Sequence, residues 1–163
     1  MRLKISALLL FLLIAIVGFV PAFRSGFIDS ISAIYASVLV NLVNRDRTAL
    51  KIAELKINPV LQLAAQLKAD DMATKGYFAH NSPDGKTPWY WFESAGYKYT
   101  VAGENLAVNF ADSEQVHTAW MNSTGHRANL INSRFTEIGI ATSTGSYKGR
   151  QAVFVVQMFG KPQ

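Results

Sequence analysis

The chain has 163 residues, half of them hydrophobic, and a net charge of +5 at pH 7. Once an apolar N-terminal segment is set aside, this length suits one domain that buries its own core. The absence of cysteine excludes disulfides, cysteine-ligated zinc and thiol catalysis. The surplus of positive charge favours anionic partners such as acidic lipids or envelope polymers. Because the positive charges do not form one block, nucleic-acid binding is not expected.

The N-terminus has the pattern of an export segment. Arg2 and Lys4 precede an almost wholly apolar run over residues 5–23, close to the length of about 20 residues that spans a bilayer as a helix. The basic start predicts that the rest of the chain lies outside the membrane. Residues 1–26 are therefore either a cleaved signal peptide, as the small residues around Ala22 suggest, or a retained membrane anchor. Both alternatives make the protein extracytoplasmic, and an exported domain without disulfides favours a bacterial source.

An amphipathic pattern follows the export segment. Over residues 27–43, apolar side chains recur at steps of three and four, which predicts a helix with one apolar face. We interpret residues 27–37 as a connector helix that runs into a domain over residues 38–163, whose first helix lies near residues 41–47.

Two further helices are marked by their ends. Asn58 is a suitable N-cap, Pro59 fits the first turn, and Gly76 is a suitable C-cap. A loop over residues 77–85 is predicted by its Ser-Pro-Asp-Gly run. A short aromatic helix over residues 89–95 then ends at Gly96, and its cluster belongs mainly to the core. Its first two residues, Trp89 and Tyr90, are alternatively suited to a groove for apolar ligands or sugar rings.

The second half alternates between strands and helices. An extended segment is predicted over residues 101–110, followed by a helix capped by Asp112 or Ser113, a break over residues 122–125, and a further turn over residues 126–131. Strands over residues 137–142 and 152–159 enclose a hairpin turn over residues 145–149. Helices followed by paired strands indicate an α+β domain built in layers.

Several short segments, in this order and spacing, resemble the bacterial branch of the CAP superfamily, whose SCP-like extracellular domain occurs in cysteine-rich secretory proteins, insect antigen 5 and plant pathogenesis-related proteins. The resemblance covers residues 38–160. The segments are Asn44 to Arg47, Asn58-Pro59 with Leu61, Tyr77 to His80, Gly103 to Leu106, Trp120 to Ser123, Gly125 to Arg127 and Phe135 to Ile140.

The resemblance implies a three-layer α-β-α sandwich, here preceded by an N-terminal hydrophobic helix, with a central cavity. In the family, two histidines and two glutamates commonly line that cavity, and some members bind zinc or another divalent ion there. His80, Glu104 and His126 match three of these positions. Ser123 stands where animal and plant members have the second glutamate, so the acidic pair is incomplete.

The residues allow several interpretations of this site. His80 and His126 are possible metal ligands, and together with Glu104 they could leave a coordination position open for water or substrate. No local zinc motif is present, so the metal prediction depends on the resemblance. Alternatively, His80 caps backbone groups, His126 starts a helix, and Glu104 satisfies backbone N–H groups. Ser123 either faces the groove or caps a helix, and no G-x-S-x-G elbow marks it as a nucleophile.

Three other polar residues receive structural interpretations. We expect Asn105 to bond the backbone, His117 to be a packed or exposed helix residue, and Arg127 to donate hydrogen bonds to the loop that follows it.

Three functions are therefore open. The first is a non-enzymatic binding module whose groove, lined by His80, Glu104, Ser123 and His126, holds a small ligand, a peptide or a divalent metal such as zinc. The second is a metal-assisted hydrolase of peptide or cell-envelope material, with Glu104 as general base. The third is a structural envelope protein. The incomplete acidic set favours the first.

Overall fold

The computed structural model describes residues 34–163. The predicted signal peptide or anchor over residues 1–26, the N-terminal hydrophobic helix and most of the connector over residues 27–37 lie outside the described residues. Within residues 34–163, no helix combines the length and apolar character needed to cross a membrane.

Five helices and four strands make up the described part of the chain, which is a mixed α+β fold as predicted. In chain order these are α1 (Ala36–Ala49), β1 (Lys56–Ile57), α2 (Pro59–Lys75), α3 (Pro88–Ser94), β2 (Tyr99–Val108), α4 (Ser113–Asn122), α5 (Thr124–Leu130), β3 (Glu137–Tyr147) and β4 (Arg150–Pro162). The sheet has the order β1-β3-β4-β2, so β2 is an edge strand. β1 pairs with β3 in parallel, whereas the β2–β4 and β3–β4 pairs are antiparallel.

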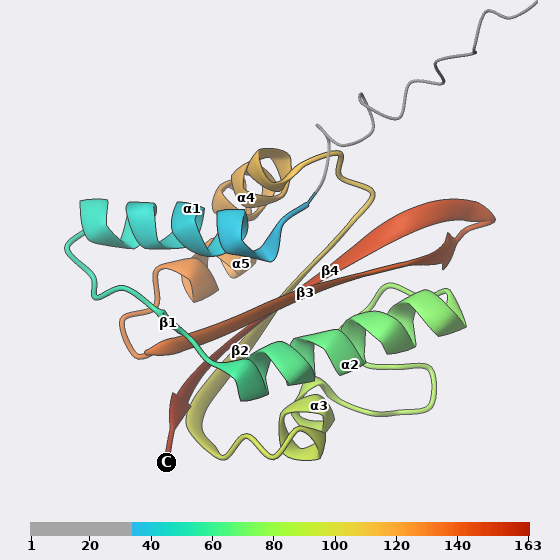
Figure 1. Cartoon of the computed structure of the whole chain (residues 1–163), viewed down its shortest axis with the longest axis horizontal. Helices are drawn as coiled ribbons and strands as arrows, with labels where there is room; N and C mark the ends of the chain where they lie inside the picture. The colour runs from blue at the N-terminus through green and yellow to red at the C-terminus, as the bar shows by residue number, and fades with distance from the viewer. Residues whose placement is uncertain (1–33) are drawn as a thin grey trace, which may run out of the picture. The chain divides into compact units, whose positions relative to one another are not determined.

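Helices cover both faces of the sheet (Figure 1). Successive side chains of a strand point to opposite faces, and β4 shows this clearly. Val156 and Met158 pack with α2 and α3, whereas Val155 and Phe159 pack with α1, α4 and α5. The sheet therefore separates two cores, each closed by its own helical layer.

The helix ends follow the local signals in the sequence. The Asn58 side chain accepts hydrogen bonds from the first turn of α2, and Gly76 ends that helix in the left-handed conformation. Asp112 caps α4 by accepting a hydrogen bond from the Gln115 backbone. These predictions are confirmed because a cap depends only on residues within a few positions of it.

The start of α1 differs from the prediction. A continuous helix over residues 27–43 is excluded at Tyr35, whose backbone is extended, and α1 begins at Ala36. The Tyr35 N–H instead donates to the Ser113 hydroxyl at the start of α4. A contact with a distant helix thus fixes a boundary that the local apolar pattern did not mark.

The β3–β4 hairpin is longer than predicted. Its turn consists of Lys148 and Gly149, both with positive φ, and Gly145 lies within β3. Two such residues form the tight turn whose twist matches that of the flanking strands. The predicted turn over residues 145–149 is therefore too wide, because Gly145 serves a close approach to α2 rather than a turn.

Three smaller differences concern the second half and the first strand. The break after α4 is confined to Ser123, and residues 124–130 form the helix α5 rather than a turn. β2 begins two residues before the predicted segment. The two-residue strand β1 carries no pattern of its own, since it exists only through pairing with β3.

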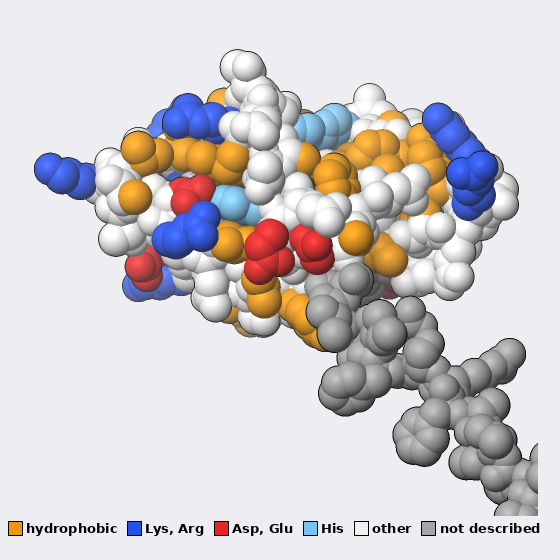
Figure 2. Space-filling view, turned by 90° about the horizontal axis from the view of Figure 1, so that it is seen from above, with side chains coloured by type: hydrophobic (Ala, Val, Ile, Leu, Met, Phe, Trp, Pro, Cys, Tyr) orange, Lys and Arg blue, Asp and Glu red, His pale blue; other side chains and the backbone are white. Residues whose placement is uncertain are grey.

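Charged groups are distributed over the surface. On the face drawn in Figure 2, Lys and Arg side chains lie mainly toward the two ends, with hydrophobic, acidic and histidine side chains between them. This face therefore has no continuous basic stripe.

Candidate functional site

A histidine and a glutamate form a direct pair at the edge of the sheet. His80 Nδ1 donates to Glu104 Oε1 at 2.6 Å. The His80 side chain is 55% exposed and that of Glu104 only 2%. Glu104 Oε2 is buried and has no hydrogen-bond partner among the described residues. A buried carboxylate normally has its oxygens satisfied, so this free oxygen marks a position where a bound donor would be stabilised.

A buried lysine holds the loop that carries His80. The Lys68 ammonium donates to the backbone oxygens of Ala79 and His80 at 2.9 and 2.8 Å, and to the Tyr77 hydroxyl at 3.1 Å. Lys68 is fully buried in the middle of α2. Burial lowers its pKa, which the nearby carboxylate of Glu104 opposes. Lys68 thus fixes the backbone of His80 and supplies positive charge near Glu104.

The spacing of residues in α2 could have identified Lys68 as a buried residue, although lysine is usually exposed. Leu61, Ala65, Lys68 and Met72 recur at helical spacing, and all four are buried. A lysine on the apolar stripe of a helix indicates a buried cation with dedicated partners.

His126 approaches the same edge from the other helical layer. It lines a hollow of about 260 Å³ together with Ser123 at the α4–α5 junction. The other walls are mostly apolar and come from β2, α4 and the loop after α2, namely Phe78, Leu106, Ala107, Val108, Phe110, Ala119 and Trp120. His80 and Glu104 are not part of this lining, although the charge of His80 acts on His126. Of the four predicted groove residues, only Ser123 and His126 thus line this hollow, and the His80–Glu104 pair lies outside its lining.

A network of buried amides positions His126. Asn105 Nδ2 donates to the backbone oxygen of His126 at 3.2 Å and to Gln157 Oε1 at 3.1 Å. Asn129 Nδ2 donates to Asn105 Oδ1 at 2.9 Å. The prediction that Asn105 bonds the backbone is confirmed, and its partner is the backbone of a candidate site residue.

A hydrogen bond between two of the lining residues fixes part of the wall of the hollow. Trp120 Nε1 donates to the Leu106 backbone oxygen at 2.9 Å. Since β2 is an edge strand, this bond satisfies a carbonyl that no neighbouring strand reaches. The Ser123 hydroxyl, in contrast, makes no capping hydrogen bond.

Two other polar predictions have different outcomes. His117 is a packed residue, as one interpretation held, and its Nε2 donates to Asp46 Oδ2 at 2.8 Å between α4 and α1. The prediction for Arg127 is wrong, because its side chain makes no hydrogen bond within residues 34–163. The loop after α5 is held instead by Arg47, which donates to the carbonyls of Leu130, Asn132 and Phe135.

The aromatic residues of α3 are partly buried in the core and partly exposed at the surface. Trp91 and Phe92 are buried in the core, whereas Trp89 and Tyr90 remain about two-fifths exposed.

The described residues do not offer a ready zinc centre. Among residues 34–163, no three His, Asp or Glu side chains lie close enough together to hold a metal ion. His80 Nδ1 and Glu104 Oε1 already bond each other, whereas a catalytic zinc site usually has three protein ligands. The arrangement of the described residues therefore does not fit a three-ligand zinc site.

The two histidines have pKa values shifted in opposite directions. The hydrogen bond from His80 to Glu104 raises the pKa of His80 above its ordinary 6.5, although burial opposes this. Burial lowers the pKa of His126, and the nearby charge of His80 lowers it further. His80 therefore binds its proton more tightly than His126 does.

We expect an NMR titration of the imidazole signals to show His80 titrating above pH 6.5 and His126 below it. Because the folded protein binds the His80 proton more tightly, the pair stabilises the fold fully below pH 6.5, and this contribution is lost as the pH rises through the higher pKa of the folded state. Glu104→Gln should return the pKa of His80 toward its ordinary value. A His80 that titrates below His126 would contradict the pairing.

A known protein family matches most of this chain. The Cysteine-rich secretory protein family, CAP, matches residues 40–159. YkwD of Bacillus subtilis (strain 168) is 38% identical over 133 residues, which cover 82% of this chain and 49% of YkwD. The membrane protein YlbC of the same organism is 29% identical over 109 residues, which cover 67% of this chain and 32% of YlbC. The chain thus spans about half of the first relative and about a third of the second.

Solved structures show the same fold. An extracellular protein containing an SCP domain from Bacillus anthracis str. Ames has a TM-score of 0.67 and 28% identity, over 77% of this chain and 40% of that protein. An outer surface protein from Borrelia burgdorferi has a TM-score of 0.67 and 25% identity, over 78% of this chain and 92% of that protein. The resemblance in the sequence motifs is confirmed, and the chain belongs to the cysteine-rich secretory protein (CAP) family.

Proposed function

We propose that this protein is an extracytoplasmic, non-enzymatic binding module that holds a small ligand or a peptide at the outer edge of β2. The observation that carries the proposal is the mostly apolar hollow of about 260 Å³, with Ser123 and His126 on its wall. Binding sites typically combine such an apolar lining with a few polar groups that orient the ligand. The unpartnered oxygen of Glu104 adds an acceptor nearby.

The export pattern of residues 1–23 supports the extracytoplasmic location, with the N-terminal segment either removed or kept in the membrane. The similar proteins named as extracellular, outer surface or membrane proteins agree with this location.

The experiment titrates the full-length protein with N-acetylphenylalanine amide, a probe that combines an apolar side chain with peptide groups. NMR signals of the Trp120 indole N–H and the His126 imidazole should shift saturably. Ser123→Trp should abolish the shifts, because the new indole would fill the hollow. Asn122→Trp is the matched control, since Asn122 is the exposed neighbour on α4 and does not line the hollow.

The two other functions are outcomes of the same experiment. If the protein hydrolysed peptide or envelope material, and Glu104→Gln abolished this activity, the protein would be a hydrolase and not a binding module. Saturable shifts of the His80 and His126 imidazoles on adding zinc would identify the ligand as a divalent metal. Absence of binding and of turnover would leave a structural envelope protein.

A further inference from the structure

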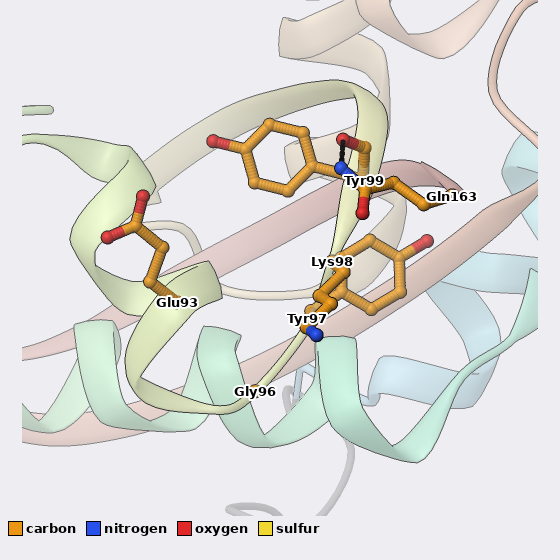
Figure 3. A pocket seen from close by; sticks show the side chains of 6 residues that line it. All are labelled: Glu93, Gly96, Tyr97, Lys98, Tyr99 and Gln163. Carbon is orange, nitrogen blue, oxygen red and sulfur yellow. Dashed lines mark hydrogen bonds between the residues drawn. The ribbon is translucent and has the colours of Figure 1, made fainter.

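A second and larger hollow lies at the beginning of β2. It has a volume of about 600 Å³ and is lined by Glu93, Gly96, Tyr97, Lys98, Tyr99 and Gln163 (Figure 3). Tyr99 precedes Leu106, the first residue of β2 that lines the other hollow, by seven residues, which corresponds to about 23 Å along an extended strand. This hollow is therefore separate from the one that His126 lines.

Aromatic rings form one side of the hollow. The rings of Tyr97 and Tyr99 are nearly parallel, with an interplanar angle of 16° and centroids 6.4 Å apart. The Tyr97 hydroxyl donates to Glu137 Oε2 at 2.7 Å, which fixes that ring. Trp89, 42% exposed, extends the aromatic surface from α3, with its ring 6.1 Å from that of Tyr99. Tyr97 is itself buried and supports Tyr99 from behind, so the ring surface open to a ligand comes from Tyr99 and Trp89.

Polar groups surround the rings. Glu93 lies four residues after Trp89 on α3, so the two side chains share one face of the helix. Figure 3 shows the Tyr99 hydroxyl directed toward the side of the hollow where Glu93 lies. Burial and the charge of Glu93 raise the pKa of Tyr99, so its hydroxyl remains a donor at neutral pH. Gln163 Nε2 donates to the Tyr99 backbone oxygen at 3.5 Å on the opposite side.

We propose that this hollow is a binding site for a neutral, β-linked glycan chain. A pyranose ring with equatorial substituents presents a flat C–H face, which packs on tyrosine and tryptophan rings, and a rim of hydroxyls, which bond carboxylate, amide and ammonium groups. Both kinds of partner are present here, from Tyr99 and Trp89 and from Glu93, Lys98 and Gln163. A purely apolar ligand would desolvate Glu93 and Lys98 without replacing their water. The lining carries one negative and one positive side chain, so it has no net charge that would favour a polyanionic chain.

The test measures binding of two probes, cellotetraose and the β-1,4-linked tetramer of N-acetylglucosamine, to the full-length protein by isothermal titration calorimetry. At least one probe should bind saturably. Trp89→Ala and Glu93→Ala should each weaken that binding about tenfold, which corresponds to about 1.4 kcal/mol. Both residues are exposed, and near-UV circular dichroism verifies that the variants fold.

Tyr90→Ala is the matched control. Tyr90 is 41% exposed on the same helix, but its ring packs against Trp91 and under the Lys86 ammonium instead of against Tyr99. Its loss should change affinity less than twofold. His126→Ala should also leave glycan binding unchanged, so this proposal and the proposed function can fail independently. Absence of binding to both tetramers, or equal losses in Trp89→Ala and Tyr90→Ala, would overturn the glycan site.

Discussion

Arg47→Met should lower the free energy of unfolding by about 3–5 kcal/mol. The guanidinium is fully buried and donates to four carbonyls, those of Ala53, Leu130, Asn132 and Phe135, at 2.8–3.2 Å. Methionine keeps much of the volume but removes all four hydrogen bonds, and the carbonyls of Leu130 and Phe135 would then be left unsatisfied in buried positions. The loss is measured by urea denaturation of the full-length protein, followed by tryptophan fluorescence.

Two control variants separate this effect from a general loss of positive charge. Arg45→Met, two residues away, should change stability by less than about 0.5 kcal/mol, because the Arg45 side chain is 64% exposed and, among residues 34–163, pairs only with its neighbour Asp46. Arg47→Lys should be nearly as damaging as Arg47→Met, since one ammonium cannot reproduce the planar fork of five donors. Equal losses in the Arg45 and Arg47 variants would contradict the role given to Arg47.

Arg47 also shows which parts of the fold the sequence could predict. The ends of α2 and the start of α4 were predictable because Asn58, Gly76 and Asp112 act on backbone groups within one turn. The mistaken role of Arg127 has the opposite cause. The loop after α5 needed a buried donor, and the donor comes from more than 80 residues earlier in the chain. Such a partner is specified by the tertiary packing and leaves no local pattern.

In the candidate site, too, some residues could be identified from local sequence motifs and others depend on tertiary packing. His80, Glu104 and His126 were identified through short motifs that resemble a family, and the structure pairs the first two directly. Of the two residues that keep them in place, Lys68 was not predicted, and Asn105 was predicted to bond the backbone without its partner being identified. Lys68 holds the His80 backbone from α2, and Asn105 holds the His126 backbone from β2. Both are buried polar residues at positions where the helix or strand pattern calls for an apolar one.

These supports give the edge of β2 its character. An edge strand has unpaired backbone groups, and the side chains of Asn129 and Trp120 satisfy the carbonyls of Glu104 and Leu106. The edge is thus partly closed by the protein itself, and Leu106 and Trp120, which form part of this closure, also line the hollow. A rigid, partly satisfied edge suits a preorganised binding site, because little ordering is needed when a ligand arrives.

The approach of α2 to β3 is the second structural feature with a large predicted effect. A Cβ at Gly139 would overlap backbone atoms of Leu61 and Gln62, and a Cβ at Gly145 would overlap the backbone of Ala73. The two glycines are six strand residues apart, about 20 Å, and Leu61 and Ala73 are twelve helical residues apart, about 18 Å. The helix therefore runs along the strand in contact with it at both ends.

Gly139→Ala should therefore destabilise the fold by about 3 kcal/mol, at the upper end of the usual cost of overpacking, because the obstacle is helix backbone and no side chain can rotate away. Gly125→Ala is the matched control with the opposite sign. Gly125 lies in α5 with no atom within 4 Å of its added Cβ, so alanine should stabilise by up to about 1 kcal/mol through helix propensity. Urea denaturation measures the free energy of unfolding of both variants. A Gly139→Ala protein as stable as the parent would contradict this prediction, because it would mean that α2 can move away from β3 at little cost in free energy.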